Sequence, residues 1–419
     1  MPQFTKPGPP IPEPLRGLEP DTWAHYTVTE RMPDIARRVL AENNFPPAIV
    51  ERMEALIEEI PYRTIRPLED PTAPDAPDWE RYVAPYLGQN WLQVPWFFAE
   101  MYFYRRIVEA TGYFQTGPGQ GIDPYSRQKQ QGLEMATEPA RILARRLRGW
   151  LSNPARNGEA LTLLLVTALW GNQADLSIWP AGGAEEQPGH EDIHQSLAHI
   201  VVNETGAILE YVSELGTISR VDFLVDNAGF ELISDLGLAD YLLDSGLAEV
   251  VHLHLKAHPT FVSDALIRDV YRTIEHLETS PDVNVRLFAA RLEDHLQDGS
   301  LRLFRHFYWN SPLSGWEMPD SVRDDLAASR LVISKGDANY RRLLGDRHWP
   351  FTTPFEDIVC YFPAPLVALR TFKSELAAGL PPGLPEELSR EDPRWLVNGR
   401  RGVIQFAHPG RSHSAGSSA

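Results

Sequence analysis

The spacing of hydrophobic residues divides the chain into two parts of different character. From about Thr29 to Leu169, apolar residues recur at intervals of three and four, as in ERMPDIARRVLAENN and AIVERMEALIEEI, which predicts helices. The segment WLQVPWFFAEMYFYRRIVEAT is so aromatic that we expect it to be buried, and Pro95 stands where its helix would begin. We therefore predict an extended proline-rich lead over 1–20 and a mainly helical N-terminal region over 21–215.

After Gly216, short β-rich runs alternate with helical periodicity. The runs are RVDFLVDNAG, AEVVHLHLKAHP, LRLFRHFYWN, SRLVISKGDANY and DIVCYF. Helical stretches such as ELISDLGLADYLLDSG lie between the first four of them. Strands that alternate with helices predict parallel βαβ units with both faces of the sheet covered. The predicted fold class is thus α/β, with a helical N-terminal region, a doubly wound, mostly parallel α/β/α domain over 216–408, and a disordered tail over 409–419.

Composition and charge narrow the range of functions. The 419 residues are 43% hydrophobic and 23% charged, as in a folded globular protein, and the formal net charge of −18 argues against nucleic acid and anionic membranes as partners. A single cysteine excludes an internal disulfide. The start of the chain has no signal-peptide pattern, and the longest apolar stretch, 161–170, is too short to cross a bilayer. We expect a cytoplasmic protein, and its oligomeric state stays open.

The first candidate chemistry is the pair Asp226 and Asn227, which directly follows the apolar run VDFLV. In doubly wound sheets, ligands bind beyond the carboxyl ends of the strands. A carboxylate beside an amide oxygen suits a hard cation such as Mg²⁺ or Mn²⁺. A turn or a helix cap uses the same residue types, and on this stretch alone that explanation is the better one.

Other predicted strand ends carry charged residues too, and these favour a ligand site. They are Lys256 and Asp264 after the second run, Lys335, Gly336 and Asp337 after the fourth, and Arg370 and Lys373 after the fifth. Since the carboxyl ends of parallel strands meet at one edge, these side chains are predicted to converge. A metal ion with nearby lysines is what a phosphoryl group requires, because both neutralise charge on its oxygens.

These residues also carry a family resemblance. The segments LWGNQADLS, VDNAG, KAHPTFVSD, KGDANYRRL and RTFK together resemble the metal-dependent damage-control phosphatases, and most of all the subfamily with an Arg-Thr-x-Lys signature, here 370–373. PWFFAEMYFYRRI and NGRRGVIQF fit the same family, so the resemblance runs from about Pro20 to Phe406. Gln173 stands where a basic residue is common and Ala338 where a larger apolar residue is common, and neither change removes a metal ligand.

The resemblance implies a set of functional residues and an activity. It implies Asp226, Asn227 and Asp264 as ligands of Mn²⁺, with Co²⁺, Ni²⁺ or Mg²⁺ as alternatives. It implies that Lys373 meets the phosphate of a small phosphorylated sugar, such as fructose 1-phosphate or fructose 6-phosphate, cleared in metabolite damage control. The substrate-contacting stretch that it implies consists of Asp337, Ala338, Asn339, Tyr340 and Arg341.

Further roles follow from the predicted mechanism, the hydrolysis of a sugar phosphate. We predict that Lys335 assists Lys373 at the phosphate and that Asp337 activates water or contacts a sugar hydroxyl. Asp226 as a covalent nucleophile is the less favoured alternative. Two further groups of residues, Asn172 with Asp175 and Glu100, are predicted to reach the same crevice, although helix or loop capping explains them equally well.

Two other patterns look like metal sites and are interpreted otherwise. GHEDIH contains His190, Glu191 and His194 in metalloprotease order, but Pro188 and Gly189 precede it and predict a loop rather than the helix that such a site needs. His252 and His254 alternate along a predicted strand, and we interpret them as neutral, partly buried histidines.

Three alternative functions stay open. A relative in this family has been described as an S-adenosylmethionine-dependent protein carboxyl O-methyltransferase, but the sequence has no convincing glycine-rich loop for that cofactor after its first strand. A phosphosugar-binding protein without turnover is a second alternative, and a phosphatase of another phosphoester, such as a phosphopantetheine derivative, is a third.

Overall fold

A seven-stranded sheet forms the centre of the chain in the computed structural model, which describes residues 4–153, 157–171 and 197–408. The strand order is β1-β7-β6-β5-β2-β3-β4, and among these neighbours only β6 and β7 are antiparallel. The strands are β1 (Ile200–Asn203), β2 (Val221–Leu224), β3 (Val251–Leu255), β4 (Leu301–Arg305), β5 (Leu331–Lys335), β6 (Leu366–Thr371) and β7 (Gly402–Ala407). The predicted mostly parallel α/β fold is therefore confirmed.

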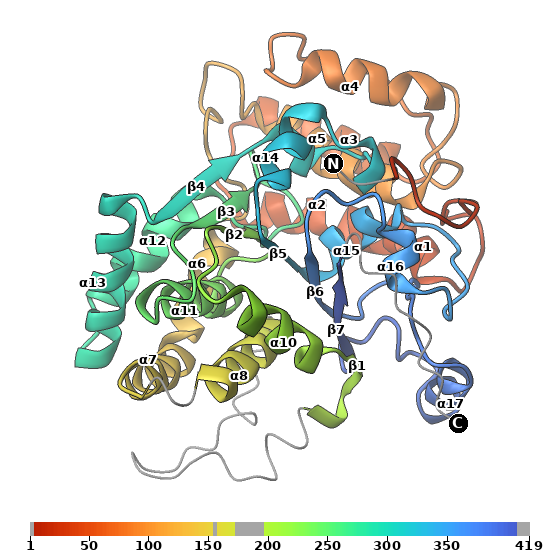
Figure 1. The fold of residues 1–419 in the computed structure, drawn as a ribbon. Helices are drawn as coiled ribbons and strands as arrows, with labels where there is room; N and C mark the ends of the chain where they lie inside the picture. The colour runs from red at the N-terminus through yellow and green to blue at the C-terminus, as the bar shows by residue number, and fades with distance from the viewer. Residues whose placement is uncertain (1–3, 154–156, 172–196, 409–419) are drawn as a thin grey trace.

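Helices cover both faces of this sheet (Figure 1). Two consecutive residues of β2 show the two layers, because Phe223 packs into one hydrophobic cluster and Leu224 into the other. The Phe223 side is covered by α6 (Ser126–Met135), α7 (Thr137–Leu151), α8 (Asn157–Trp170), α10 (Thr205–Leu215), α11 (Phe230–Asp244), α12 (Ile267–Glu278) and α13 (Val283–Asp298). The Leu224 side is covered by α1 (Trp23–Tyr26), α2 (Met32–Glu42), α3 (Pro47–Glu59), α4 (Ala76–Val83), α5 (Trp96–Thr111), α14 (Asp320–Ala327), α15 (Gly336–Leu344), α16 (Phe355–Ile358) and α17 (Leu384–Glu391).

The aromatic helix α5 begins where the sequence predicted. Pro95 is its N-cap residue, every residue from Trp96 to Thr111 is buried, and the helix ends at Gly112 in the left-handed conformation. A helix buried all round needs partners on every side, and α5 packs against α2 and α3. None of the helices in the described ranges has both the length and the apolar character needed to cross a bilayer.

Part of the strand prediction was wrong. DIVCYF (357–362) is not a strand: Pro354 caps the short helix α16, and turns follow it. The strand β6 begins only after Pro365, at Leu366. The sheet also contains β1, which lies within 21–215, where mainly helices were expected. It contains β7 as well, which lies close to the end of the predicted α/β domain, 216–408. The predicted disordered tail, 409–419, lies outside the described residues.

The order of the strands creates a switch point between β2 and β5. From β2 the chain moves outward to β3 and β4, and it then returns to place β5 and β6 on the other side of β2. The connections on the two sides of the switch point therefore lead away from each other and leave a crevice at the carboxyl ends of β2 and β5. Asp226 and Asn227 follow β2, and Gly336 and Asp337 follow β5.

Candidate active site

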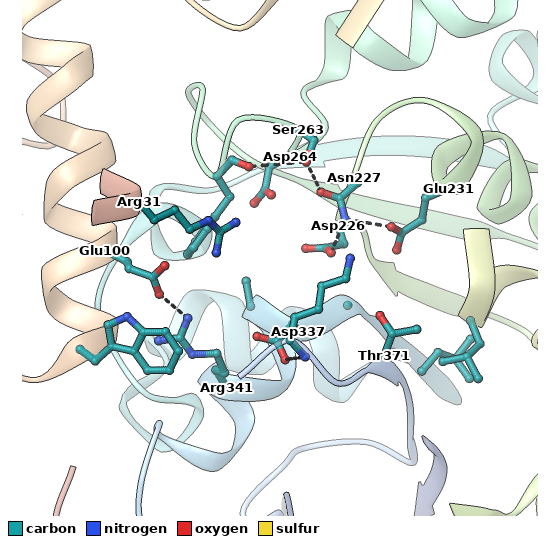
Figure 2. Close-up of a pocket in the computed structure, with 17 residues that line it drawn as sticks. Arg31, Glu100, Asp226, Asn227, Glu231, Ser263, Asp264, Asp337, Arg341 and Thr371 are labelled. Atoms are coloured by element: carbon teal, nitrogen blue, oxygen red, sulfur yellow. Dashed lines mark hydrogen bonds and ion pairs between the residues drawn. The ribbon is translucent and has the colours of Figure 1, made fainter. Parts of the chain in front are cut away.

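The segments that follow β2, β3, β5 and β6 meet around one cavity at the switch point (Figure 2). The cavity has a volume of about 120 Å³, so it suits a small molecule rather than a segment of a macromolecule. Eight of the residues predicted from the sequence line it: Glu100, Asp226, Asn227, Asp264, Asp337, Ala338, Arg341 and Lys373.

Backbone pairing brings the three predicted metal ligands together. Asn227 and Asp264 form an isolated antiparallel bridge, although 37 positions separate them in the sequence. The amide of Ala265 donates to the carbonyl of Asp226 at 2.8 Å, and the amide of Ala228 donates to that of Ser263 at 2.7 Å. The loop after β2 is thus fixed against the loop after β3, and both present oxygen-bearing side chains to the same cavity.

The loop that carries Asp264 has a strained backbone. Phe261 has a φ of 46° and Val262 a φ of 66°, and a β-branched residue rarely adopts this left-handed conformation. Phe261 and Ser263 line the cavity on either side of the strained valine. Such strain persists only where the surrounding structure enforces it, and it is concentrated at functional sites.

The two carboxylates of this group lie in an environment that disfavours their charge. Burial, together with the neighbouring Asp264 and Glu231, holds the pKa of Asp226 well above its usual range. Burial likewise raises the pKa of Asp264 to about 6, although Lys256 opposes the shift with its amine 3.3 Å from Oδ2. Lys256 is the ion-pair partner of Oδ2 of Asp264 among the described residues. Two buried carboxylates close together fit a site that a cation would stabilise.

The side chain of Asn227 is held at both ends of its amide group. Its nitrogen donates to Oδ2 of Asp226 at 2.6 Å and to Oε2 of Glu231 at 2.8 Å, and its oxygen accepts from the hydroxyl of Ser263 at 2.5 Å. Figure 2 shows this chain of contacts along one wall of the cavity. The nitrogen, and not the oxygen, therefore faces Asp226. For Asn227 to coordinate a cation beside Asp226, its amide has to turn over, and the Ser263 hydroxyl can then accept from the nitrogen.

Two cationic side chains line the cavity without partners in the described part of the chain. Lys373 follows β6, and its amine makes no hydrogen bond or ion pair there. Arg31 comes from the helical layer, at the end of a π-helix over Thr27–Arg31, and it points into the cavity across from Asp226 (Figure 2). These two cations are available to an anionic ligand.

The remaining charged residues at the cavity pair with one another. Arg341 binds the carboxylates of Glu100 and Asp346, and its guanidinium lies 3.7 Å from the centre of the Trp96 ring. Both predicted substrate contacts, Glu100 and Arg341, therefore form a buried pair that walls the cavity. Their pairing satisfies their hydrogen bonds before any ligand enters.

Asp337 anchors the segment that carries Lys373. Its Oδ1 accepts from Nε of Arg370 at 2.8 Å, from the hydroxyl of Ser374 at 3.0 Å and from the amide of Lys373 at 3.4 Å. Although burial opposes it, the Arg370 guanidinium lowers the pKa of Asp337. A carboxylate with a lowered pKa is a weak proton acceptor, so this geometry argues against the predicted role of Asp337 in activating water.

Three predicted substrate-binding residues point away from the cavity. The amine of Lys335 is buried between Asp235, at 2.7 Å, and Glu231, at 3.1 Å, so it does not assist Lys373 at a phosphate. Asn339 donates to backbone carbonyls of β2 and β5. Tyr340 is buried against Gln405. All three side chains contact the protein interior next to the cavity, because their places on β5 and α15 direct them there. Asn172 and Asp175, which were predicted to reach the crevice, lie outside the described residues. So do His190, Glu191 and His194, which were interpreted as part of a loop.

Comparison with known proteins identifies the family. A model of the damage-control phosphatase ARMT1-like domain matches residues 27–388, most of the chain. The chain belongs to the ARMT1-like damage-control phosphatase family.

Curated relatives agree with this assignment over most of their length. Damage-control phosphatase ARMT1 of Rattus norvegicus is 36% identical over 338 residues, which cover 76% of each chain. The Xenopus tropicalis protein of the same name is 32% identical over 431 residues, with 92% of this chain and 96% of the relative covered. The Homo sapiens protein is 30% identical, with 95% and 99% covered. A solved DUF89 family protein from Pyrococcus horikoshii has a TM-score of 0.45 at 14% identity, with 91% of this chain and 97% of that chain covered.

The ARMT1-like site also contains residues that the sequence analysis missed. Arg31 comes from a helix nearly 200 positions before Asp226, and no local pattern linked the two. Glu231 had a detectable signal, because it is an acidic residue in the first turn of α11, shortly after the Asp226–Asn227 pair. Ser263 directly precedes Asp264, and Thr371 belongs to the Arg-Thr-x-Lys signature.

Proposed function

We propose that this ARMT1-like protein is a metal-dependent phosphatase of small phosphorylated sugars of the fructose 1-phosphate or fructose 6-phosphate type. Family membership supports a phosphatase role in metabolite repair. The observation that carries the finer proposal is a small cavity lined by oxygen-bearing side chains and by two cations, Lys373 and Arg31, that make no hydrogen bond or ion pair within the described residues. That arrangement fits a phosphoryl group, which binds cations on several oxygens at once.

The oxygen ligands fit a divalent metal by their chemistry. Asp226, Asn227 and Asp264 would hold the ion, with Mn²⁺ as the first choice and Co²⁺, Ni²⁺ or Mg²⁺ as alternatives. The burial and the raised pKa of both carboxyls support a site that a cation would stabilise. When bound, such an ion neutralises phosphoryl charge and lowers the pKa of a coordinated water.

The other residues of the cavity bind and orient the substrate in this proposal. Lys373 and Arg31 hold phosphoryl oxygens from the side opposite the carboxylates. The N-terminus of α15 adds backbone N–H groups at Gly336 and Asp337, which favour an anion. The buried Glu100–Arg341 pair and the Trp96 ring form an inner wall that limits the space for water. The small volume restricts the substrate to a short sugar.

The test is a matrix of metals and substrates. Phosphate release from fructose 1-phosphate and fructose 6-phosphate is measured with purified protein and Mn²⁺, Co²⁺, Ni²⁺ or Mg²⁺. We expect Asp226→Asn to abolish metal-dependent release and the exposed Asp324→Asn on α14 to leave it unchanged. Full activity of Asp226→Asn, or no release with any metal, would refute the proposal. Calorimetry with S-adenosylmethionine tests the methyltransferase alternative, and sugar-phosphate binding without phosphate release would identify a binding protein without turnover.

A further inference from the structure

A second group of metal-binding side chains lies on the sheet, away from the cavity. Asp222 on β2 pairs in register with His252 on β3, and His254 follows two residues later on the same face. Asp325 reaches the group from α14. The ligand atoms of these four residues all lie within 4.8 Å of one another. Asp222 is four residues before Asp226, so along a strand the two positions are roughly 13 Å apart.

The contacts within this group leave one nitrogen without a partner. Nε2 of His254 is hydrogen-bonded to Oδ1 of Asp222 at 2.7 Å, a contact that an ion held by both residues would replace, and it lies 4.0 Å from Oδ2 of Asp325. Nδ1 of His252 is directed at the same Oδ1 of Asp222, but at 3.6 Å it forms no hydrogen bond, and it is buried. Only 7% of the His252 side chain is exposed. A buried ring nitrogen without a partner, aimed at a carboxylate, leaves room for an ion between them.

The charges of the group favour a cation as well. Arg220 donates to both oxygens of Asp222 at 2.8 and 2.7 Å and to Oδ1 of Asp325 at 2.9 Å. One guanidinium faces two carboxylates, so one negative charge stays unbalanced when the histidines are neutral. The buried Nδ1 of His252, which has no hydrogen-bond partner among the described residues, is available as a ligand. Arg220 holds the carboxylates in place, as hydrogen-bonding neighbours of metal ligands commonly do.

The rings are fixed in position, and the site has a path to solvent. His252 and His254 both pack against Phe304, with ring centres 4.6 and 5.9 Å away, and Trp309 lies 5.8 Å from His254. The Asp325 side chain is 38% exposed, so an ion can enter from the α14 side. Preoriented rings lose little conformational freedom on binding, and this raises affinity.

We propose that His252, His254, Asp222 and Asp325 form a second divalent-metal site, distinct from the substrate cavity. Two imidazole nitrogens with carboxylate oxygens are the donor set that Zn²⁺ takes in tetrahedral sites. The bound ion connects β2, β3 and α14. Because β2 leads to Asp226 and β3 leads to Lys256, the ion stabilises the strand ends on which the cavity is built.

Metal stoichiometry tests this proposal. Protein freed of metal by a chelator is titrated with Zn²⁺ in a calorimeter, and with Co²⁺, whose visible absorption reports nitrogen ligands. The double variant Asp226→Asn/Asp264→Asn removes both carboxylates of the cavity site and leaves the second group intact. We expect it to bind one Zn²⁺ per chain. Adding His252→Gln should weaken that binding by about 100-fold or more, because a ligand is lost.

A matched pair of variants on α14 provides a second test in case the histidine variant does not fold. In the same double-variant background, Asp325→Asn should weaken Zn²⁺ binding by about tenfold or more, and its exposed neighbour Asp324→Asn should not change it. Circular dichroism of the metal-free variants checks the fold. The proposal is overturned if the double variant binds no Zn²⁺, or if its bound Zn²⁺ survives both His252→Gln and Asp325→Asn. Because both cavity carboxylates are absent and only Zn²⁺ binding is measured, these outcomes do not depend on the proposed phosphatase activity.

Discussion

Gly336 offers a sharp test of the cavity, because its missing side chain makes room for Asp226. The residue has a φ of 81° and begins α15 directly after β5. A β-carbon built on it would lie 2.8 Å from the β-carbon of Asp226 and would overlap the carboxylate. A predicted metal ligand thus lies directly against this glycine. Replacing Gly336 by alanine must displace Asp226 or shift the start of α15.

The size of the effect follows from two separate contributions. An alanine at positive φ costs about 1–2 kcal/mol of stability, whatever its surroundings. Carbon atoms pack at ~3.5–4.0 Å, so the two β-carbons must also move apart by roughly 1 Å. A displacement of about 1 Å in a catalytic group can lower the rate by about 10²-fold. We therefore expect Gly336→Ala to lower kcat/KM by about two orders of magnitude and to weaken metal binding.

Gly246, in the turn after α11, supplies the matched control. Its φ is 71°, and a β-carbon built there meets nothing within 4 Å. Gly246→Ala should therefore lose a similar amount of stability and keep its activity. Metal-dependent phosphate release, calorimetric metal affinity and chemical denaturation are measured on both variants. If Gly336→Ala keeps kcat/KM and metal affinity within twofold of the unmodified protein, the argument that Gly336 makes room for Asp226 is wrong.

Three further predictions separate support from binding. Lys335→Met should destabilise the fold by about 3–5 kcal/mol, because it leaves two buried carboxylates unpaired. Lys373→Met should keep its Tm and raise KM. Equal losses of Tm in the two variants would contradict this prediction. Arg31→Gln should likewise raise KM for a phosphorylated sugar without changing metal affinity, and an unchanged KM would exclude the contact. Burial lowers the pKa of His258 to about 4. Below about pH 6.5, His258 therefore binds a proton in the unfolded chain but not in the folded chain. Up to about 3 kcal/mol of folding stability is lost as the pH falls to about 4. Denaturation across this range should show a smaller loss in His258→Gln.

The local pattern of the chain was enough to predict most of the sheet. Periods of two and of three to four residues separate strands from helices, and the strand-helix alternation after Gly216 implies parallel pairing. The same pattern failed at DIVCYF, whose apolar residues suit a strand but follow the helix-capping Pro354. It also gave no sign of β7, whose antiparallel pairing with β6 depends on contacts between distant segments.

The sequence by itself determined that the Asp226–Asn227 pair and Gly336 directly follow strands. Lys373 follows β6, which the local pattern had placed too early, at DIVCYF. The tertiary structure decided which of them face the cavity. Two lysines at neighbouring strand ends differ in this way, because Lys335 is buried among the carboxylates of α11, whereas Lys373 lines the cavity without an ion pair to any described residue.

Only the tertiary structure brought Arg31 to the cavity and placed His252, His254 and Asp325 around Asp222. The physical reason is one of range. Local periodicity determines where a strand lies and which face of it each residue occupies. The partner of a buried charge depends instead on the distant segment that packs against it.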